Sequence, residues 1–297
     1  MLSLPISDAP MVKANDAPPI LRSPALMDLP YIQHGFSTRT CGNLATRYGP
    51  PAEVAAARRT FARLTGIDSN RVAHFGLTHS SRVGLVSEAD AVPIDETPYR
   101  ISIRGLLCDA GPHDLSFTNP QGVSNQSGVD CLITTTPGVS LFMVVGDSAP
   151  VLLIAPGGKA IALAHVGIVG TVNHVLENTI RTLCRIVPCR PSEITAVIGP
   201  TVGPCCYALA QSLTWAQVVA QVFFDEYGPK GPGIVVRNDQ YFFDLPAAIT
   251  DVLRRERLLP SMIHAMNVCT ACPHTPFFSH QAGVAGRFGT LLALRQV

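Results

Sequence analysis

Three short apolar runs follow one another near the middle of the chain, at residues 139–145, 151–154 and 160–166. Each has the length of a buried strand, is rich in β-branched residues, and is bounded by glycine, proline, serine or aspartate. The pattern predicts three successive core strands. A helical period follows, with apolar residues at positions 172, 175, 176, 180, 183 and 187. Thr171 is therefore the expected N-cap of a helix that begins after a glycine-rich loop.

Further strands and helices are predicted on both sides of this stretch. Helices are expected at 52–64, 211–226 and 245–259, and strands within 71–86, at 194–198 and at 262–268. Residues 1–30 hold six prolines and little periodicity, which predicts a poorly ordered leader. Residues 87–128 are weakly patterned and are interpreted as an irregular insertion. A chain of 297 residues can bury a core as one large domain or two smaller ones.

Composition narrows the classes of partner. The chain has 22 basic and 21 acidic residues and is only 14% charged, so nothing favours nucleic acid or an anionic membrane surface. No apolar run reaches the roughly 18 residues of a membrane span, and the N-terminus lacks a basic signal region. Nine cysteines scattered along a long chain suit a reducing compartment. We expect a soluble, cytoplasmic protein with a small-molecule substrate and an unknown oligomeric state.

Polar residues interrupt the central apolar stretch at two places. Asp147 and Ser148 separate the first two predicted strands, and His165 stands near the end of the third. Buried polar groups need a partner or a chemical role, so these positions are candidates for a site. The loop that follows, with Gly167, Gly170 and Thr171, leads into a predicted helix N-terminus, where an anion can bind.

At this level the chain resembles the laccase-domain family, also called polyphenol-oxidase-like, across roughly residues 31–294. The phrases that carry the resemblance are HGFSTR from His34, DCLIT from Asp130, GDSAPV from Gly146, HVGIVGT from His165, GP from Gly199, CCY from Cys205, CT from Cys269, FFS from Phe277, and GR from Gly286. Members of that family are zinc-dependent purine nucleoside phosphorylases with adenosine deaminase side activity. The resemblance implies an α+β fold with a mixed β-sheet core flanked by helices, in a single large domain at residues 31–297.

The resemblance also implies a site. The family's His, Cys and His trio falls on His79, Ser148 and His165, which are the predicted catalytic residues, so serine stands where the family has cysteine. Further departures are Ser80, Ile168, Val169, Ala208 and Gln281. The predicted substrate- or anion-binding residues are Arg39, Asp147, Gly167, Gly170, Thr171 and His280.

The missing cysteine weakens the case for zinc. A catalytic zinc site takes three ligands from thiolate, imidazole and carboxylate, and a serine hydroxyl is not among them. We therefore predict no resident cofactor and well under one zinc per chain; His79 and His165 are the residues that would hold a metal ion if one binds. The pair Cys269 and Cys272, with His274 and His280 nearby, is interpreted as packing, since a structural zinc site needs a second ligand pair. The chain has no His-x-His pair, so a multinuclear copper centre lacks obvious ligands.

Three functions remain open. The main hypothesis is a diverged enzyme of a specialised or biosynthetic reaction, whose altered site performs acyl transfer, cyclisation or dehydration on a small molecule. Ser148 is then either a nucleophile beside a histidine or a spacer that fills the cysteine's place. The alternatives are purine nucleoside phosphorolysis or adenosine deamination, as in the family, and a non-catalytic small-molecule-binding protein.

Overall fold

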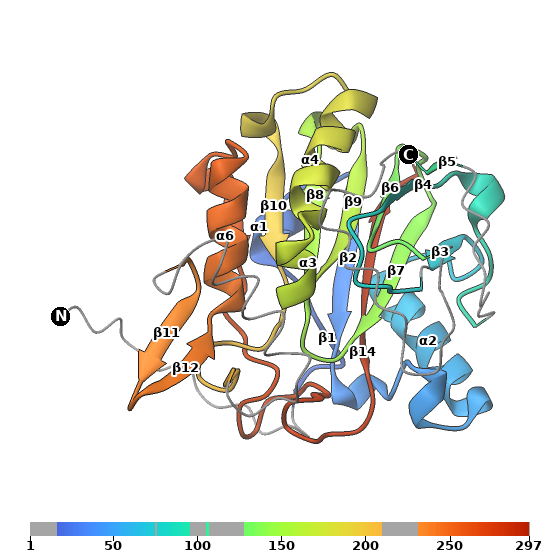
Figure 1. Cartoon of the computed structure of the whole chain (residues 1–297). Coiled ribbons are helices and arrows are strands. Elements are labelled where there is room, and N and C mark those ends of the chain that lie inside the picture. The colour runs from blue at the N-terminus through green and yellow to red at the C-terminus, as the bar shows by residue number, and fades with distance from the viewer. Residues whose placement is uncertain (1–16, 75, 96–104, 107–127, 210–230, 297) are drawn as a thin grey trace.

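The computed structural model describes residues 17–74, 76–95, 105–106, 128–209 and 231–296. Over these residues the chain forms two mixed sheets and a small hairpin, with helices on the outer faces (Figure 1). The α+β class predicted from the sequence is confirmed. The predicted helix at 211–226 and most of the insertion at 87–128 lie outside the described residues.

The first sheet has the strand order β1-β2-β14-β7-β3. Its strands are β1 (Ile20–Leu21), β2 (Ile32–Ser37), β3 (Val72–His74), β7 (Ser140–Val145) and β14 (Phe288–Leu294). All neighbours are antiparallel except β3 and β7, which run parallel. The strand β14, near the end of the chain, therefore pairs with the early strand β2 on one side and with the central strand β7 on the other.

The second sheet has the order β13-β10-β8-β9-β6-β4-β5. Its strands are β4 (Val83–Leu85), β5 (Gly105–Leu106), β6 (Cys131–Thr134), β8 (Ala149–Ile154), β9 (Ile161–Val166), β10 (Thr195–Ile198) and β13 (Ile263–Ala265). The three central strands predicted from the apolar runs are confirmed as β7, β8 and β9. However, β7 joins the first sheet, whereas β8 and β9 pair with each other in the second.

The core is layered because side chains alternate across each strand. Leu152 and Ile154 of β8 face the cluster between the two sheets, which also contains Leu141 and Leu292 of the first sheet. Residues in alternate positions of β8, such as Val151, belong to the cluster under the helices. Both faces of the second sheet are thus buried, which explains why its strands are continuously apolar in sequence.

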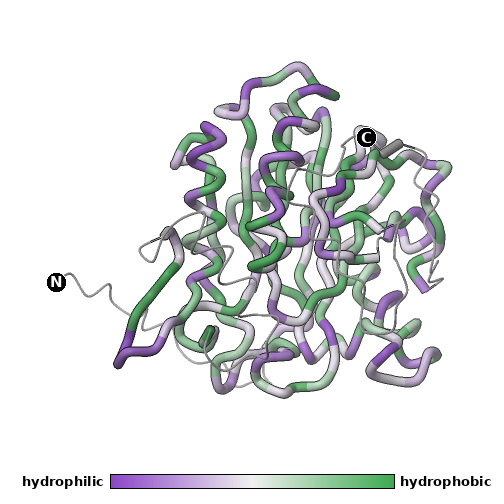
Figure 2. Tube along the Cα trace, viewed as in Figure 1, coloured by the Kyte–Doolittle hydropathy of each residue, from purple (hydrophilic) through white to green (hydrophobic). Residues whose placement is uncertain are grey.

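The helices cover the outer faces of the two sheets. These are α2 (Pro51–Thr65), α3 (Ile168–Val172), α4 (Val175–Ile186) and α6 (Leu245–Arg255), in addition to the short α1 (Pro24–Met27). The helix α2 packs on the first sheet through Phe61 and Phe142, and α3, α4 and α6 pack on the second. The hairpin of β11 (Ile234–Arg237) and β12 (Gln240–Phe243) lies beside α6 (Figure 1). Apolar colour follows the central strands, and α4 and α6 alternate in colour, as one-sided helices do (Figure 2).

Two expectations are corrected by the fold. The described part of the predicted leader is ordered, because Ile20 and Leu21 pair with β2 and Leu26 is fully buried. Thr171 is not an N-cap. It lies inside α3, whose N-cap is Gly167, and its hydroxyl donates to the carbonyl of Gly167 at 3.0 Å.

The longer helix α4 starts only at Val175. His174 precedes it with a left-handed backbone (φ 59°), which breaks the helical period predicted from residue 172. Among the described residues, no helix has the length and apolarity of a membrane span.

Candidate active site

The site forms where β8 begins and β9 ends. These strands are antiparallel and Pro150 pairs with His165, so the turn before β8 lies against the chain that follows β9. The contact is close: a Cβ on Gly167 would lie 3.1 Å from the hydroxyl oxygen of Ser148. A side chain at this position would require the serine hydroxyl to shift by a few tenths of an ångström. The convergence of these two strand ends is therefore built into their register.

A cavity of about 480 Å³ opens at this point. Six of the predicted site residues line it: His79, Asp147, Ser148, His165, Gly167 and His280. Its volume is in the range of small-molecule sites. The remaining walls come from the loop after β10, with Val202 and Tyr207, and from Arg287 before β14.

The two histidines lie together at the base of the site. Their ring centroids are 5.1 Å apart, and the side chain of His165 is almost fully buried. Asn173 donates from its side chain to the carbonyl of His79 at 2.7 Å, which ties the His79 loop to the end of α3. His79 itself has a positive φ of 57°. The backbone therefore fixes where this imidazole is placed.

Asp130 orients His165. Its Oδ1 lies 2.9 Å from Nδ1 of His165, and its Oδ2 accepts from the backbone N–H of Ser80 at 2.5 Å and from the hydroxyls of Ser80 and Thr78 at 2.9 and 3.1 Å. The carboxylate is fully buried. It holds the proton of His165 on Nδ1, so Nε2 is left as an acceptor. Sequence reasoning quoted Asp130 only as part of a phrase and missed this role.

Burial sets the charges of the group. Burial, reinforced by the nearby His165, lowers the pKa of His79 to about 4, so its imidazole is neutral at neutral pH. Burial alone would raise the pKa of Asp130, but the hydrogen bonds from His165 and from the Ser80 N–H hold it below its usual value. An ionised carboxylate behind a histidine, next to a second and neutral histidine, is an arrangement suited to proton transfer.

Asp147 has a different environment. Its carboxylate accepts from the hydroxyls of Thr270 and Ser279, each at 2.7 Å, and from the N–H of Gln281 at 2.8 Å. These bonds fasten the chain after β13 to the turn before β8. Burial, followed by the charge of Asp147, raises the pKa of Tyr207 to about 12, so this wall of the cavity carries a neutral phenol.

Three predicted anion-binding residues lie away from the cavity lining. Arg39 donates from its guanidinium and its backbone N–H to the carbonyls of Thr275 and Pro276, and Gly170 and Thr171 are buried within α3. Arg39 is not among the residues that line this cavity, and its role in anion binding stays a prediction.

Arg287 lines the cavity instead. It donates to the hydroxyl of Tyr48 at 2.7 Å and to the carbonyl of Gly286. It also packs tightly over the turn before β8, since a Cβ on Gly146 would meet its side chain at 2.8 Å. Its position in the GR phrase was the signal that could have identified it.

The zinc site that the resemblance implies is not matched by the residues present. The nitrogen and oxygen atoms of His79, Asp130 and His165 lie within 4.8 Å of one another. However, both oxygens of Asp130 already accept hydrogen bonds, and Ser148 offers a hydroxyl rather than a thiolate. Two imidazoles remain, one fewer ligand than a catalytic zinc site uses.

The interpretation of Cys269 and Cys272 as packing was based on a missing second ligand pair, and that premise is wrong. Cys205 and Cys206 supply the pair, and the four Sγ atoms lie within 4.8 Å of one another. The residues that complete the set lie more than 60 positions away in sequence, with the loop spacing giving no indication of the contact.

Together these features define an α+β protein with a buried histidine pair, a carboxylate behind it, and a cavity of small-molecule size. The family model described as multi-copper polyphenol oxidoreductase laccase matches residues 33–295. The chain belongs to this family, as its motifs predicted.

Named relatives and solved structures agree with this assignment. The chain is 30% identical to purine nucleoside phosphorylase YlmD of Geobacillus stearothermophilus over 57% of this chain and 61% of that protein. It is 26% identical to adenosine deaminase RL5 of an unknown prokaryotic organism, over 80% of each. It is 28% identical to human purine nucleoside phosphorylase LACC1 over 54% of this chain, but only 36% of that protein.

The crystal structure of YlmD from Geobacillus stearothermophilus superposes with a TM-score of 0.73 at 22% identity, covering 97% of this chain and all of the other. The structure of Bacillus licheniformis YfiH gives the same TM-score at 21% identity. This chain therefore has the same fold as both of these proteins. The chain spans about three-fifths of the length of the YlmD sequence it matches and about four-fifths of RL5.

Proposed function

We propose that this protein is an enzyme that cleaves a purine nucleoside, or a close relative of one, by phosphorolysis in the cavity beside His79 and His165. The observation that carries the proposal is the His165–Asp130 pair, which leaves an acceptor nitrogen at a cavity of about 480 Å³. The names of relatives that match this chain, purine nucleoside phosphorylase and adenosine deaminase, support the substrate class. The diverged reaction expected from the sequence has less support.

The chemistry needs one proton to move. An oxygen of hydrogen phosphate attacks C1′ of the sugar, the bond from C1′ to the purine nitrogen breaks, and the proton of the phosphate ends on the purine. His165 can accept that proton on Nε2 and return it to the departing base, because Asp130 stabilises the imidazolium formed in between. Neutral His79 adds a hydrogen-bonding group without adding a competing positive charge.

The anion and the base need separate partners in the cavity. Arg287 supplies a positive charge at the lining for phosphate. Val144, Ile168 and Val169 supply apolar surface for a purine ring. Phosphorolysis fits this lining better than deamination. Its nucleophile, hydrogen phosphate, is already an anion, whereas the water that attacks in hydrolytic deamination is activated by a metal ion, which needs a full set of ligands.

Ser148 supports a second candidate. It lines the cavity two residues before Pro150, which pairs with His165, so a hydroxyl stands near a general base. Acyl transfer through Ser148 would use the same histidine. A covalent adduct on this residue after incubation with an acyl donor would favour that reaction over phosphorolysis.

The test is product analysis with matched variants. Purified protein is incubated with inosine, guanosine or adenosine, with and without phosphate, and free base and sugar phosphate are measured by chromatography. We expect phosphate-dependent release of base that His165→Gln abolishes. His264→Gln, on the edge strand β13, is the matched control and is expected to retain activity. No base from any of the three nucleosides would contradict the proposal.

A further inference from the structure

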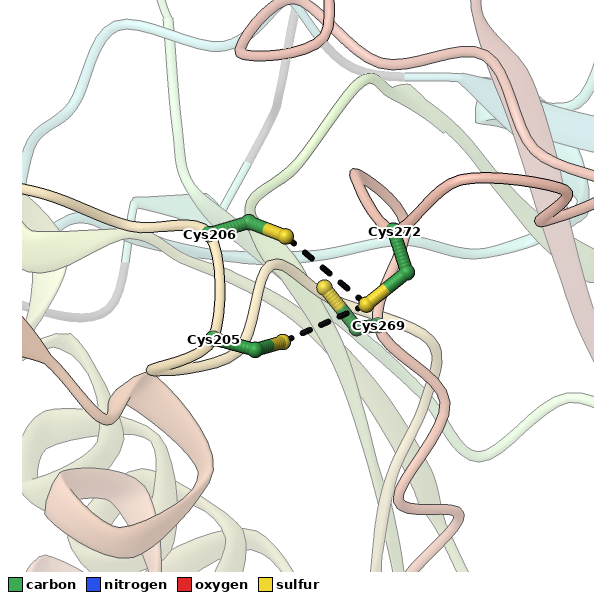
Figure 3. A group of neighbouring side chains, drawn as sticks. All are labelled: Cys205, Cys206, Cys269 and Cys272. Atoms are coloured by element: carbon green, nitrogen blue, oxygen red, sulfur yellow. Dashed lines mark hydrogen bonds between the residues drawn. The ribbon is translucent and has the colours of Figure 1, made fainter.

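Four cysteines from two distant loops converge on one point. Cys205 and Cys206 lie in the loop after β10, and Cys269 and Cys272 lie in the loop after β13. The strands β10 and β13 are parallel neighbours, so their carboxyl ends leave the sheet at the same edge. A bridge between Thr201 and Cys269 continues the pairing into the loops. All four side chains point toward a common centre (Figure 3).

The spacing of the sulfurs matches that of ligands around a single ion. Sγ of Cys272 lies 3.3 Å from that of Cys205 and 3.7 Å from that of Cys206, and all four sulfurs are within 4.8 Å of one another. A tetrahedron with metal–sulfur bonds of about 2.3 Å has sulfurs about 3.8 Å apart. The side chains therefore need only small rotations to enclose an ion. A cluster with several metal atoms would require the sulfurs to lie farther apart.

The backbone prepares the cysteine loop for this arrangement. The N–H groups of Cys206 and Tyr207 both donate to the carbonyl of Gly203, which folds the loop so that two successive cysteines turn inward. The N–H of Gly203 donates to Sγ of Cys269 at 3.3 Å. Hydrogen bonds from backbone N–H groups to a sulfur stabilise the thiolate that a metal needs.

We propose that Cys205, Cys206, Cys269 and Cys272 bind one zinc ion that holds the two loops together. Four thiolates in a tetrahedron are the ligand set of structural zinc sites, and soft sulfur ligands select zinc over magnesium or calcium. A disulfide would use two of the sulfurs and would not account for the convergence of the other two. Cys205 is exposed, so the ion can enter from solvent.

The ion would stabilise one wall of the cavity. Thr270, next to Cys269, donates to the carboxylate of Asp147 at 2.7 Å, and Thr201 donates to the carbonyl of Asp147 at 2.6 Å. Tyr207, next to Cys206, lines the cavity. The zinc site is thus structural, separate from the histidines, and independent of which reaction they perform.

The test begins with metal content. The full chain is purified under reducing conditions, reconstituted with zinc without oxygen, desalted, and analysed by elemental mass spectrometry. We expect one zinc per wild-type chain and close to none in the double variant Cys205→Ser/Cys272→Ser. The matched control is Cys189→Ser, which removes a thiol of the Cys184–Cys189 pair elsewhere in the chain and should retain the ion. The double variant His79→Ala/His165→Ala should also retain it.

A second measurement covers the case in which a cysteine variant fails to fold. X-ray absorption of the wild-type zinc protein should show four sulfur neighbours at about 2.3 Å, and zinc should protect four thiols from alkylation. Nitrogen-rich coordination, zinc that persists in the cysteine variant, iron in place of zinc, a disulfide between these cysteines in reduced protein, or four reactive thiols after reconstitution would each overturn the proposal.

Discussion

The described part of the chain contains two groups of side chains whose ligand atoms converge, and the groups differ in the hydrogen bonds that those atoms already make. In the histidine group the carboxylate of Asp130 is committed to His165, Ser80 and Thr78. In the cysteine group the four sulfurs face one another and only Sγ of Cys269 accepts a backbone N–H in the described hydrogen bonds. Both groups bring their ligand atoms within 4.8 Å of one another, yet they are sites of different kinds. A ligand set is defined by its uncommitted lone pairs as much as by its spacing.

Location reinforces the difference. In the histidine group, Asp130 and His165 are buried at the start of β6 and the end of β9, and the half-buried His79 lies in a loop beside them, whereas the cysteine group lies entirely in loops and is partly exposed. Buried groups on regular elements suit reactions that need fixed geometry. Loops that leave one sheet edge together need a crosslink to hold them. We expect the two groups to respond independently to metal removal and to mutation.

The largest effect on stability is expected from removing the zinc ion of the cysteine group. Chelation of zinc from the wild-type protein should lower the midpoint of thermal unfolding by on the order of 5–10 °C, since an ion present at about 1,000 times its dissociation constant adds roughly 4 kcal/mol to the free energy of unfolding. Calorimetry with and without chelator measures this shift. In Cys205→Ser/Cys272→Ser the chelator should not change the unfolding midpoint. A shift of the same size as in the wild type would show that the cysteine group does not hold the ion that the chelator removes.

Next in size is the loss of activity in Asp130→Asn. An amide at this position can hold His165 in the wrong tautomer and no longer stabilises its charged form, so kcat/KM for the nucleoside should fall about 10²–10⁴-fold. Steady-state kinetics gives the ratio. Zinc content at the cysteine group should not change in the same preparation. Activity within a factor of three of wild type would remove Asp130 from the proposed chemistry.

A smaller effect is expected from Ser148→Cys. A thiolate beside two imidazoles completes the three-ligand set that the histidine group lacks, so zinc uptake should rise. The background is Cys205→Ser/Cys272→Ser, which removes the other group from the measurement. Elemental analysis of the variant against that background should show added zinc. The matched Ser148→Ala variant should add none, and equal zinc in both would place position 148 outside the reach of the histidines.

A further effect, seen only at acidic pH, concerns histidines that belong to neither group. Burial, aided by Arg22 and Arg58 respectively, lowers the pKa of His34 to about 4 and that of His74 to about 3. Both are neutral in the folded protein but become protonated in the unfolded chain below about pH 6.5. The free energy of unfolding should therefore be unaffected above that pH and fall as the pH decreases from about 6.5 to 4.

Urea unfolding at several pH values measures this slope. In His74→Phe, where an aromatic ring replaces the imidazole against Phe142, part of the slope should disappear while the stability above pH 7 is little changed. An identical slope in wild type and variant would show that other groups, those of the histidine site included, control acid sensitivity.

Much of the fold was predictable because local pattern and tertiary structure agree. The strands β7, β8 and β9 and the helix α2 follow apolar runs and helical periods that the sequence shows directly. The predicted helix start at Thr171 was wrong because α3 already ends at Asn173, whose side chain donates to the carbonyl of His79, and because the left-handed φ of His174 interrupts the helical backbone before α4. Tertiary demands overrode a local capping signal at this point.

The site was predictable only in part. His79, Ser148 and His165 were found through motif phrases, and the structure brings all three to one cavity. The role of Asp130 depends on its pairing across β6 and β9, and the meeting of the cysteines depends on the parallel register of β10 and β13. Contacts of that kind are set by sheet topology, which spacing along the chain does not encode.

The left-handed backbone of His79 has a consequence for how the protein tolerates change. A side chain costs about 1–2 kcal/mol in this conformation, whereas glycine adopts it freely. Replacement of His79 by glycine should therefore give a more stable protein than replacement by alanine, although both remove the imidazole. At this position the requirements of folding and of chemistry oppose each other, so selection for thermal stability alone would favour glycine over the histidine that the proposed reaction uses.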